Sequence, residues 1–195
     1  MKKPPMFIVS RHARRPGTAS DPASPGAGDE KSYVPFGDAQ FSRLEWQQPR
    51  RLRQHFELRS ERGLLLTLGT ADMWGKHWVA RGDRLAWDLR SRWIGAVAVT
   101  AQSSDALLLD FRPGWWRNGR VATAAGESLR WRLASLRAFQ LETEEGSPLL
   151  TLRRLGWFRF QSSLELSEAA RSRPDVAPLA ALTLQLVLAA RRHTH

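Results

Sequence analysis

Two segments of the chain alternate strictly between apolar and polar side chains, the pattern of an antiparallel strand with one buried face. In DRLAWDLRS the apolar series is Leu85, Trp87 and Leu89. In SLRWRLAS it is Leu129, Trp131 and Leu133. Turn-forming sequences separate such runs: SERG at 60–63, RGDR at 81–84, RPG at 112–114, RNG at 117–119 and EEGSP at 144–148. Roughly a dozen strands fit between Tyr33 and Glu165, so we predict an all-β body.

An internal repeat organises these strands. The sequences RLEW, RLAW and SLRW end at Trp46, Trp87 and Trp131, which follow one another after 41 and 44 residues. Similar sequels come next: FELRSERGLLLTL after the first, FQLETEEGSPLLTL after the third, and IGAVAVTAQSSDALLLDF as a looser middle copy. Each unit has room for about four strands, but three units are too few for a propeller, which typically has 4–8 blades. We therefore predict a closed antiparallel barrel of about twelve strands, which is too wide to be filled by its own side chains.

The C-terminal segment DVAPLAALTLQLVLAARRH is apolar over 176–190 except for Thr183 and Gln185. A bilayer span needs about 20 residues, and the alternating leucines of LTLQLVL leave a strand as a second interpretation. A helix is favoured by Asp175 as N-cap, Pro178 in the first turn, and two arginines at the far end. Its leucines point in every direction, and a helix that is apolar all round is buried all round. We predict a hydrophobic helix over about 176–190 in the centre of the barrel, with no transmembrane span.

Residues 1–32 form a basic tail rich in Pro, Gly, Ser and Ala, which predicts disorder, so the barrel domain is assigned to 33–195. The apolar run MFIV near the N-terminus is too short for a signal peptide, and the chain has no cysteine. We expect a cytoplasmic protein.

The chain carries a net charge of +11, which indicates either a solvated arginine-rich surface or contact with an anionic partner. The segment RPGWWRNGR predicts a loop with an exposed tryptophan between arginines, as suits a bilayer interface. The alternative is that both rings fold over the barrel rim. The candidate anion or membrane contacts are Trp115, Trp116, Arg117, Arg120, Arg50, Arg51 and Arg53. The segment RRLGWFRF at 153–160 could extend the same basic rim.

Catalytic and metal-binding motifs are missing from the sequence. No phosphate loop, nucleophile elbow or helical metal pair is visible, so we predict no enzyme activity, no metal and no cofactor. His77 is expected to have a structural or surface role. Asp83, Asp88 and Asp110 could gather in space, although separated carboxylates near turns are usually solvated.

The predicted barrel with a central C-terminal helix resembles the tubby C-terminal domain superfamily, which includes LURP-one-related proteins and phospholipid scramblases. The segment GLLLTLGTADMWGKHWVARGD (63–83) is similar to a recurrent pattern of that group, and GSPLLTLRR (146–154) is similar to its first half. The resemblance implies a fold over about 33–192 and, from the tubby proteins, binding of phosphoinositides. The cysteine-rich palmitoylated region and acidic calcium segment of scramblases are missing, and no phosphoinositide residue can be matched.

Together these observations predict a non-enzymatic barrel that binds an anionic ligand, such as membrane phospholipid or phosphoinositide, at the membrane periphery. A protein-interaction scaffold with a merely solubilising charge is the alternative. Nucleic-acid binding is less favoured because the charges are scattered along the chain.

Overall fold

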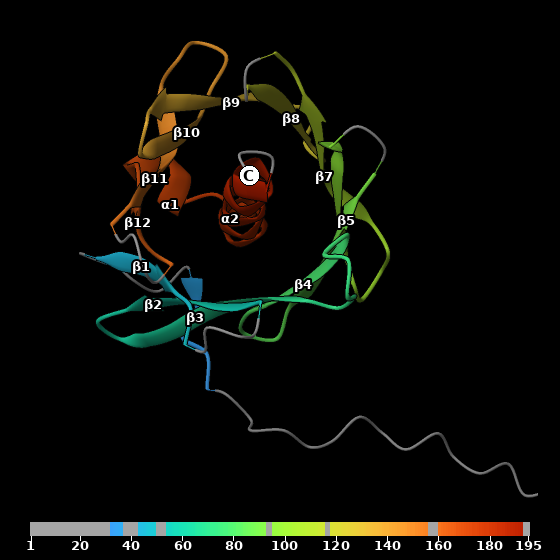
Figure 1. The fold of residues 1–195 in the computed structure, drawn as a ribbon, viewed down its shortest axis with the longest axis vertical. Coiled ribbons are helices and arrows are strands. Elements are labelled where there is room, and N and C mark those ends of the chain that lie inside the picture. Colours follow the sequence, from blue (N-terminus) through green and yellow to red (C-terminus); the bar gives the residue numbers. More distant parts are fainter. Residues whose placement is uncertain are drawn as a thin grey trace, which may run out of the picture. The chain divides into compact units, whose positions relative to one another are not determined.

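The chain folds as a closed antiparallel barrel around a central helix (Figure 1). The computed structural model describes residues 32–36, 43–49, 54–92, 95–115, 118–155 and 160–192. Within them lie twelve strands: β1 (Leu44–Gln47), β2 (His55–Ser60), β3 (Gly63–Thr70), β4 (His77–Arg81), β5 (Ala86–Ser91), β6 (Val97–Ala101), β7 (Leu107–Pro113), β8 (Gly119–Thr123), β9 (Ser128–Ser135), β10 (Ala138–Glu142), β11 (Pro148–Arg154) and β12 (Gln161–Leu166). A short helix α1 (Glu168–Arg171) and the long helix α2 (Val176–Arg192) follow. The predicted fold class is confirmed.

Every strand pairs antiparallel with its neighbours in sequence, and β12 closes the barrel on β1. Successive connections therefore alternate between the two ends of the barrel. The connections after β1, β3, β5, β7, β9 and β11 form one end, which we call the C-terminal rim because Val187 and Arg191 of α2 lie there beside Leu136. The other end, where the chain passes from β12 into α1, is the α1 rim.

The tryptophan repeat marks three four-stranded units. Trp46, Trp87 and Trp131 are buried and lie on β1, β5 and β9. On one side, each tryptophan is paired with a small residue of the neighbouring strand: Ser162 of β12, Ala80 of β4 and Gly119 of β8, respectively. Small side chains leave room for an indole ring in the adjacent position of a pleated sheet. Gly119 is also packed closely against another aromatic side chain, because a Cβ atom at this position would overlap the ring of Phe111.

Helix α2 fills the barrel interior (Figure 1). Its large side chains are buried on every side: Leu179, Leu182, Leu184, Leu186 and Val187. The helix approaches β3, β7 and β11, which are the third strands of the three units. Full burial of each large aliphatic side chain contributes roughly 1.5–3 kcal/mol before entropy. The strand interpretation of this segment is wrong, because all-round burial favours a helix that satisfies its own backbone groups.

The two buried polar side chains of α2 each donate a hydrogen bond. Thr183 donates its hydroxyl to the carbonyl of Leu179 at 2.8 Å, and Nε2 of Gln185 donates to Oγ of Ser91 at 3.3 Å. The helix runs to Arg192, slightly beyond the predicted end. The predicted cap takes another form: the carbonyl of Asp175 accepts the N–H of Leu179, while its carboxylate binds Arg173.

Arg173 joins the start of α2 to the barrel at the α1 rim. Its Nη1 lies 2.7 Å from Oε2 of Glu127 in the β8–β9 turn, and its Nε and Nη2 donate to the two oxygens of Asp175 at 2.8 and 2.9 Å. The hydrogen bonds to Asp175 raise the pKa of Arg173 further above its ordinary value, against the opposing effect of burial, and Glu127 adds to the rise. This cluster orders the chain where it turns into the barrel.

Two sequence-based assignments need correction at strand edges. Leu85 was expected to face the interior, but β5 begins at Ala86 and Leu85 is exposed in the preceding turn. That turn is closed by the N–H of Gly82 donating to the carbonyl of Leu85, with Arg84 at a φ of 54°. Leu133 is only half-buried, towards the end of β9. The tail at 1–32 lies outside the described residues except for Ser32.

Candidate anion-binding surface at the C-terminal rim

Exposed apolar side chains gather at the C-terminal rim. Among the described residues, five of the seven large exposed hydrophobic side chains lie on connections at this end: Met73, Trp74, Trp115, Leu136 and Leu155. Leu136 is 97% exposed and Trp115 is 84% exposed. The other two, Leu85 and Leu107, lie at the α1 rim. A concentration of apolar side chains in solvent on one face is typical of an interaction surface.

The two rims also differ in the sign of their charged residues. Three consecutive turns of the α1 rim carry acidic residues and no basic one, with Asp105, Glu127, Glu144 and Glu145. The described connections of the C-terminal rim and the adjoining ends of β11 and α2 carry more basic than acidic residues: Asp72, Lys76, Arg92, Arg137, Arg154 and Arg191. Residues 50–53, 116–117 and 156–159 lie outside the described part of the chain, and their sequences contain arginines and no acidic residue.

The predicted contact loop follows β7 at this rim. The N–H of Gly114 donates to the carbonyl of Asn118 at 2.7 Å, and the N–H of Asn118 donates to the carbonyl of Trp115 at 3.1 Å. This tight turn projects Trp115 into solvent, so the alternative in which its ring folds over the barrel is wrong for this residue. The other predicted contacts lie outside the described residues: Trp116, Arg117, Arg50, Arg51 and Arg53.

Arg120 lies in the middle of a row of three arginines on the outer wall. Strand register pairs Arg112 of β7 with Arg120 of β8, and Arg120 with Arg130 of β9. Arg112 reaches Asp110 at 3.2 Å, and Arg130 lies 3.9 Å from Oε1 of Glu142. The side chain of Arg120 is exposed and makes no hydrogen bond or ion pair within the described part of the chain. Like charges directly opposite each other destabilise a sheet.

The repeat provides an internal comparison for this pair. In each unit, one residue pair lies directly beside the tryptophan pair on the same two strands. These pairs are Arg120 and Arg130 in β8–β9, Arg81 and Ala86 in β4–β5, and Ser163 and Glu45 in β12–β1. Of these three equivalent positions, the β8–β9 pair alone places two cations opposite each other. Because the fold accommodates other residues at this position, the arginine pair is not a requirement of the barrel.

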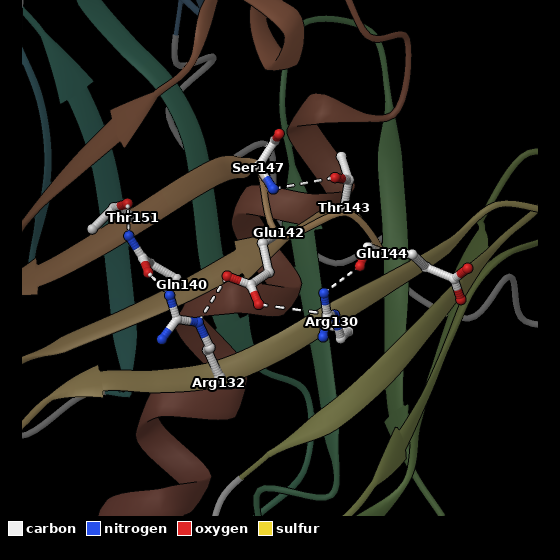
Figure 2. Close-up of polar contacts among 8 residues, drawn as sticks. All are labelled: Arg130, Arg132, Gln140, Glu142, Thr143, Glu144, Ser147 and Thr151. Carbon is white, nitrogen blue, oxygen red and sulfur yellow. Dashed lines mark hydrogen bonds and ion pairs between the residues drawn. The ribbon is translucent and has the colours of Figure 1, made fainter.

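A groove of about 300 Å³ lies beside Arg120 and Arg130 and reaches the turn after β7 at the rim. Its lining includes Arg120, Arg130, Arg132 and Glu142, together with the turn residues Gly114 and Asn118. Figure 2 shows Arg130 and Arg132 on either side of the Glu142 carboxylate. Nε of Arg132 donates to Oε2 of Glu142 at 2.7 Å. The groove therefore holds three guanidinium groups against one carboxylate, and guanidinium groups form strong charge-assisted bonds to phosphate and carboxylate.

Neighbouring contacts hold this cluster in position (Figure 2). Nη2 of Arg132 also donates to Oε1 of Gln140 at 3.0 Å, and Nε2 of Gln140 lies 3.3 Å from Oγ1 of Thr151. Arg130 donates to the carbonyl of Glu144. The guanidinium groups of β9 are thus oriented along the wall before any ligand arrives, which reduces the entropic cost of binding an anion.

The three aspartates considered in the sequence do not form one site. Asp83 is exposed in the β4–β5 turn, and Asp110 pairs with Arg92 and Arg112. Asp88 is buried and accepts hydrogen bonds from Nε2 of Gln102 at 2.8 Å and from His77 at 2.9 Å. His77 therefore has a structural partner. Among the described residues no group of three potential metal ligands occurs.

Sequence reasoning missed part of this surface. Met73 and Trp74 lie in the ADMWGK segment, where an apolar pair beside a glycine is a signal of an exposed turn. In the sequence, Arg130 and Arg132 are simply the polar positions of the alternating segment SLRWRLAS, which predicts a solvated strand face. Their proximity to Arg120 depends on strand register, which the sequence pattern did not specify.

None of the described helices is long and apolar enough to cross a bilayer. Comparison with known proteins found no matching family model, no matching curated protein and no matching solved structure.

Proposed function

We propose that this protein is a tubby-like barrel that binds the surface of an anionic phospholipid membrane through its C-terminal rim. The observation that carries the proposal is the coincidence of exposed apolar loops with basic charge at one end of the barrel. Trp115 and Leu136 supply side chains that can enter the headgroup region, and Arg120 and Arg137 supply charge beside them. The proposal is one of binding rather than catalysis, because charge and apolar surface are what gather there.

Three physical effects support this orientation. Tryptophan is enriched at bilayer interfaces because its ring is apolar and its N–H can still be hydrated. Each basic residue near an anionic bilayer contributes about 1 kcal/mol. The acidic turns of the α1 rim add a repulsive element at the other end, so that the charge distribution would turn the barrel with its C-terminal rim towards the membrane.

Vesicle sedimentation with the full chain tests the proposal. Phosphatidylcholine vesicles with and without phosphatidylserine are compared, and a third set contains a phosphoinositide. We expect binding only where anionic lipid is present. The affinity should fall as salt rises, because exposed charges are screened within about 8–10 Å at physiological ionic strength.

A matched pair of double variants locates the contact. Arg120→Gln with Arg137→Gln removes two charges from the C-terminal rim and its groove and should weaken binding about thirtyfold. Arg62→Gln with Arg171→Gln removes the same charge from the α1 rim and should change binding less than about threefold. Equal losses in the two variants would contradict the proposed orientation. Binding to duplex DNA but not to vesicles would instead favour a nucleic-acid partner, and binding to neither would favour a scaffold.

A further inference from the structure

The outer wall of the barrel holds two carboxylates that each lie between a pair of arginines. On β7, Oδ1 of Asp110 lies 3.6 Å from Nη1 of Arg92, and Oδ2 lies 3.2 Å from Nε of Arg112. Glu142 on β10 lies in the same way between the two arginines of β9, with one oxygen towards each (Figure 2). The exposed fractions of the two carboxylate side chains are only 16% and 7%. This wall therefore accommodates a carboxylate closely between neighbouring guanidinium groups.

Arg120 lies between these two clusters. Strand register places Arg112 on one side of it and Arg130 on the other. Both neighbours have a carboxylate partner, whereas the side chain of Arg120 forms no ion pair with the described residues. The equivalent strand pairs of the other two repeat units do not place two cations opposite each other, so the barrel does not require this row. The row supplies the cationic half of a third such arrangement.

The groove of about 300 Å³ beside this row is lined by groups that suit a polypeptide. Gly114 and Gly119 have no side chain that would obstruct a backbone, and the amide of the exposed Asn118 can both donate to and accept from a peptide group. The groove lies on the side of the barrel. It reaches from the turn after β7 to Arg130, which donates to the carbonyl of Glu144 at the opposite rim. A chain segment can lie along this wall, whereas a bilayer that faces the C-terminal rim meets the groove at one end.

We propose that the groove binds an extended acidic segment of a partner protein, with one aspartate or glutamate carboxylate between Arg120 and Arg130. A carboxylate is the expected anion because the wall already holds two in this arrangement. In an extended segment, alternate side chains lie on the same side, roughly 7 Å apart. A second acidic residue two positions along would lie near Arg112, because β7 is the next strand at about 4.8 Å and a long arginine side chain spans the difference. Two linked carboxylates bind more tightly than two separate ones.

Fluorescence anisotropy of labelled peptides with the full chain tests the chemistry of the partner. One blocked peptide alternates three glutamates with serines, and its control has glutamine in place of each glutamate. At physiological ionic strength we expect the glutamate peptide to bind at least about tenfold more tightly than the glutamine peptide. Equal affinity of the two peptides, or binding of neither, would overturn the proposal.

Arg120→Gln and Arg130→Gln place the peptide in the groove. Each should weaken binding of the glutamate peptide about fivefold, and thermal unfolding checks that Arg130→Gln, which loses a contact with Glu142, is still folded. Arg62→Gln removes the same charge from an exposed position at the α1 rim and should change the affinity less than about twofold. Normal binding by both groove variants would overturn the site. An equal loss in all three variants would show general attraction to a basic surface and would also overturn it.

Inorganic tripolyphosphate, as a third probe, distinguishes recognition of carboxylate from recognition of phosphate. We expect it to bind less tightly than the glutamate peptide, because its phosphate groups are linked through single oxygens and lie closer together than the arginines of neighbouring strands. If tripolyphosphate bound more tightly than the peptide and lost affinity in both groove variants, the groove would be a phosphate site and the proposal would be wrong.

This inference goes beyond the proposed membrane contact, because it concerns a protein partner on the barrel wall and needs no bilayer. The two proposals can fail separately. If anionic vesicles bind but the glutamate peptide does not, the groove proposal fails while the membrane proposal stands. If the glutamate peptide binds with the expected losses in the groove variants but anionic vesicles do not bind, the membrane proposal fails and the groove remains a site for an acidic partner.

Discussion

Each rim of the barrel has a half-buried arginine near the core, and the two arginines have different charged neighbours. At the α1 rim, Arg173 is half-buried and reaches two carboxylates, those of Glu127 and Asp175. At the C-terminal rim, Arg191 is also half-buried, but the neighbouring charge that acts on it is that of Arg154. At the α1 rim, ion pairs hold the start of α2 in position. At the C-terminal rim, positive charges lie close to one another.

The exposed apolar residues follow the same division. The C-terminal rim exposes Trp115 and Leu136 beside its arginines, whereas the α1 rim combines acidic turns with the ordered approach to α2. Stability and binding make different demands, since a stabilising ion pair forms within the chain and a binding contact forms with another molecule. We therefore expect substitutions at the α1 rim to change the free energy of unfolding and those at the C-terminal rim to change affinity.

The largest effect is expected from a substitution in the centre of α2, the helix on which both rims pack. Leu184→Asp places a charge in the fully buried centre of α2, where no partner is provided. We expect a loss of at least about 5 kcal/mol, which equals the whole stability of a domain at the lower end of the usual range of about 5–15 kcal/mol, and therefore no cooperative thermal unfolding. Ala189→Asp on the exposed side of the same helix is the control and should cost about 0.5 kcal/mol. A Leu184→Asp protein that melts cooperatively near the wild-type temperature would contradict the role of α2 as the core.

The next test acts on the α1 rim alone. Arg173→Gln leaves Glu127 and Asp175 without their shared cation and should lower the free energy of unfolding by about 2 kcal/mol in urea denaturation. Vesicle binding by the folded protein should not change. Arg171→Gln, on the neighbouring exposed position, should have less than about 0.5 kcal/mol effect. Weakened vesicle binding by the folded Arg173→Gln protein would break the proposed separation between the two ends.

A third test acts on the C-terminal rim alone. Trp115→Ala should weaken binding to anionic vesicles about tenfold, because it removes apolar area that enters the interface. Its dependence on salt should match that of the wild type, since no charge is removed. Leu107→Ala removes an exposed apolar side chain from the α1 rim and should leave binding unchanged. A changed salt dependence, without a change in affinity at low salt, would argue against insertion of the ring.

The smallest expected effect concerns Asp88 on the barrel wall between the rims. Burial would raise its pKa, but hydrogen bonds from Gln102 and His77 and the nearby charges of His77 and Arg90 outweigh burial and hold the pKa below its ordinary value. A lowered folded-state pKa stabilises the protein above the unfolded pKa of about 3.9, and this contribution is lost as pH falls through the folded value. Asp88→Asn should therefore cost about 1 kcal/mol near neutral pH and nothing in stronger acid.

Denaturation at several pH values measures that difference. The control is Asp83→Asn, in an exposed turn, which should follow the wild-type curve at each pH. If the Asp88→Asn deficit were constant down to the acid limit, the lowered pKa of Asp88 would not contribute to the stability of the folded state.

Much of the fold could be predicted because the alternation of apolar and polar residues indicates the strands and the spacing of the tryptophans indicates the units. Alternation around Trp131 predicted a strand, and the spacing from Trp46 to Trp87 predicted four strands in each unit. The error at Leu85 came from the turn before β5, where alternation continues in sequence although the backbone has not yet entered the ladder. The loop that carries Trp115 could be predicted because proline and glycine mark it, but the sequence left open whether the ring is exposed or folds over the rim.

The candidate surfaces depended on information that local periodicity does not contain. Arg120 and Arg130 are ten residues apart and meet only because β8 and β9 pair in one register. Arg154 and Arg191 come together because α2 crosses the whole barrel and ends at the rim where β11 ends. A shift of one residue in the register of β8, β9 or β11 would turn the arginine of that strand to the other face of the sheet.

By itself, the sequence determined that this protein is a twelve-stranded barrel filled by an apolar helix, because hydrophobic periodicity and the cost of exposing that helix leave few alternatives. Only the tertiary structure decided which charges are neighbours. Barrel closure and strand register brought Arg112, Arg120 and Arg130 into one row, and the path of α2 placed Arg191 against Arg154. Electrostatic interactions depend on distance in space rather than along the chain, and in this protein pairing and closure set those distances.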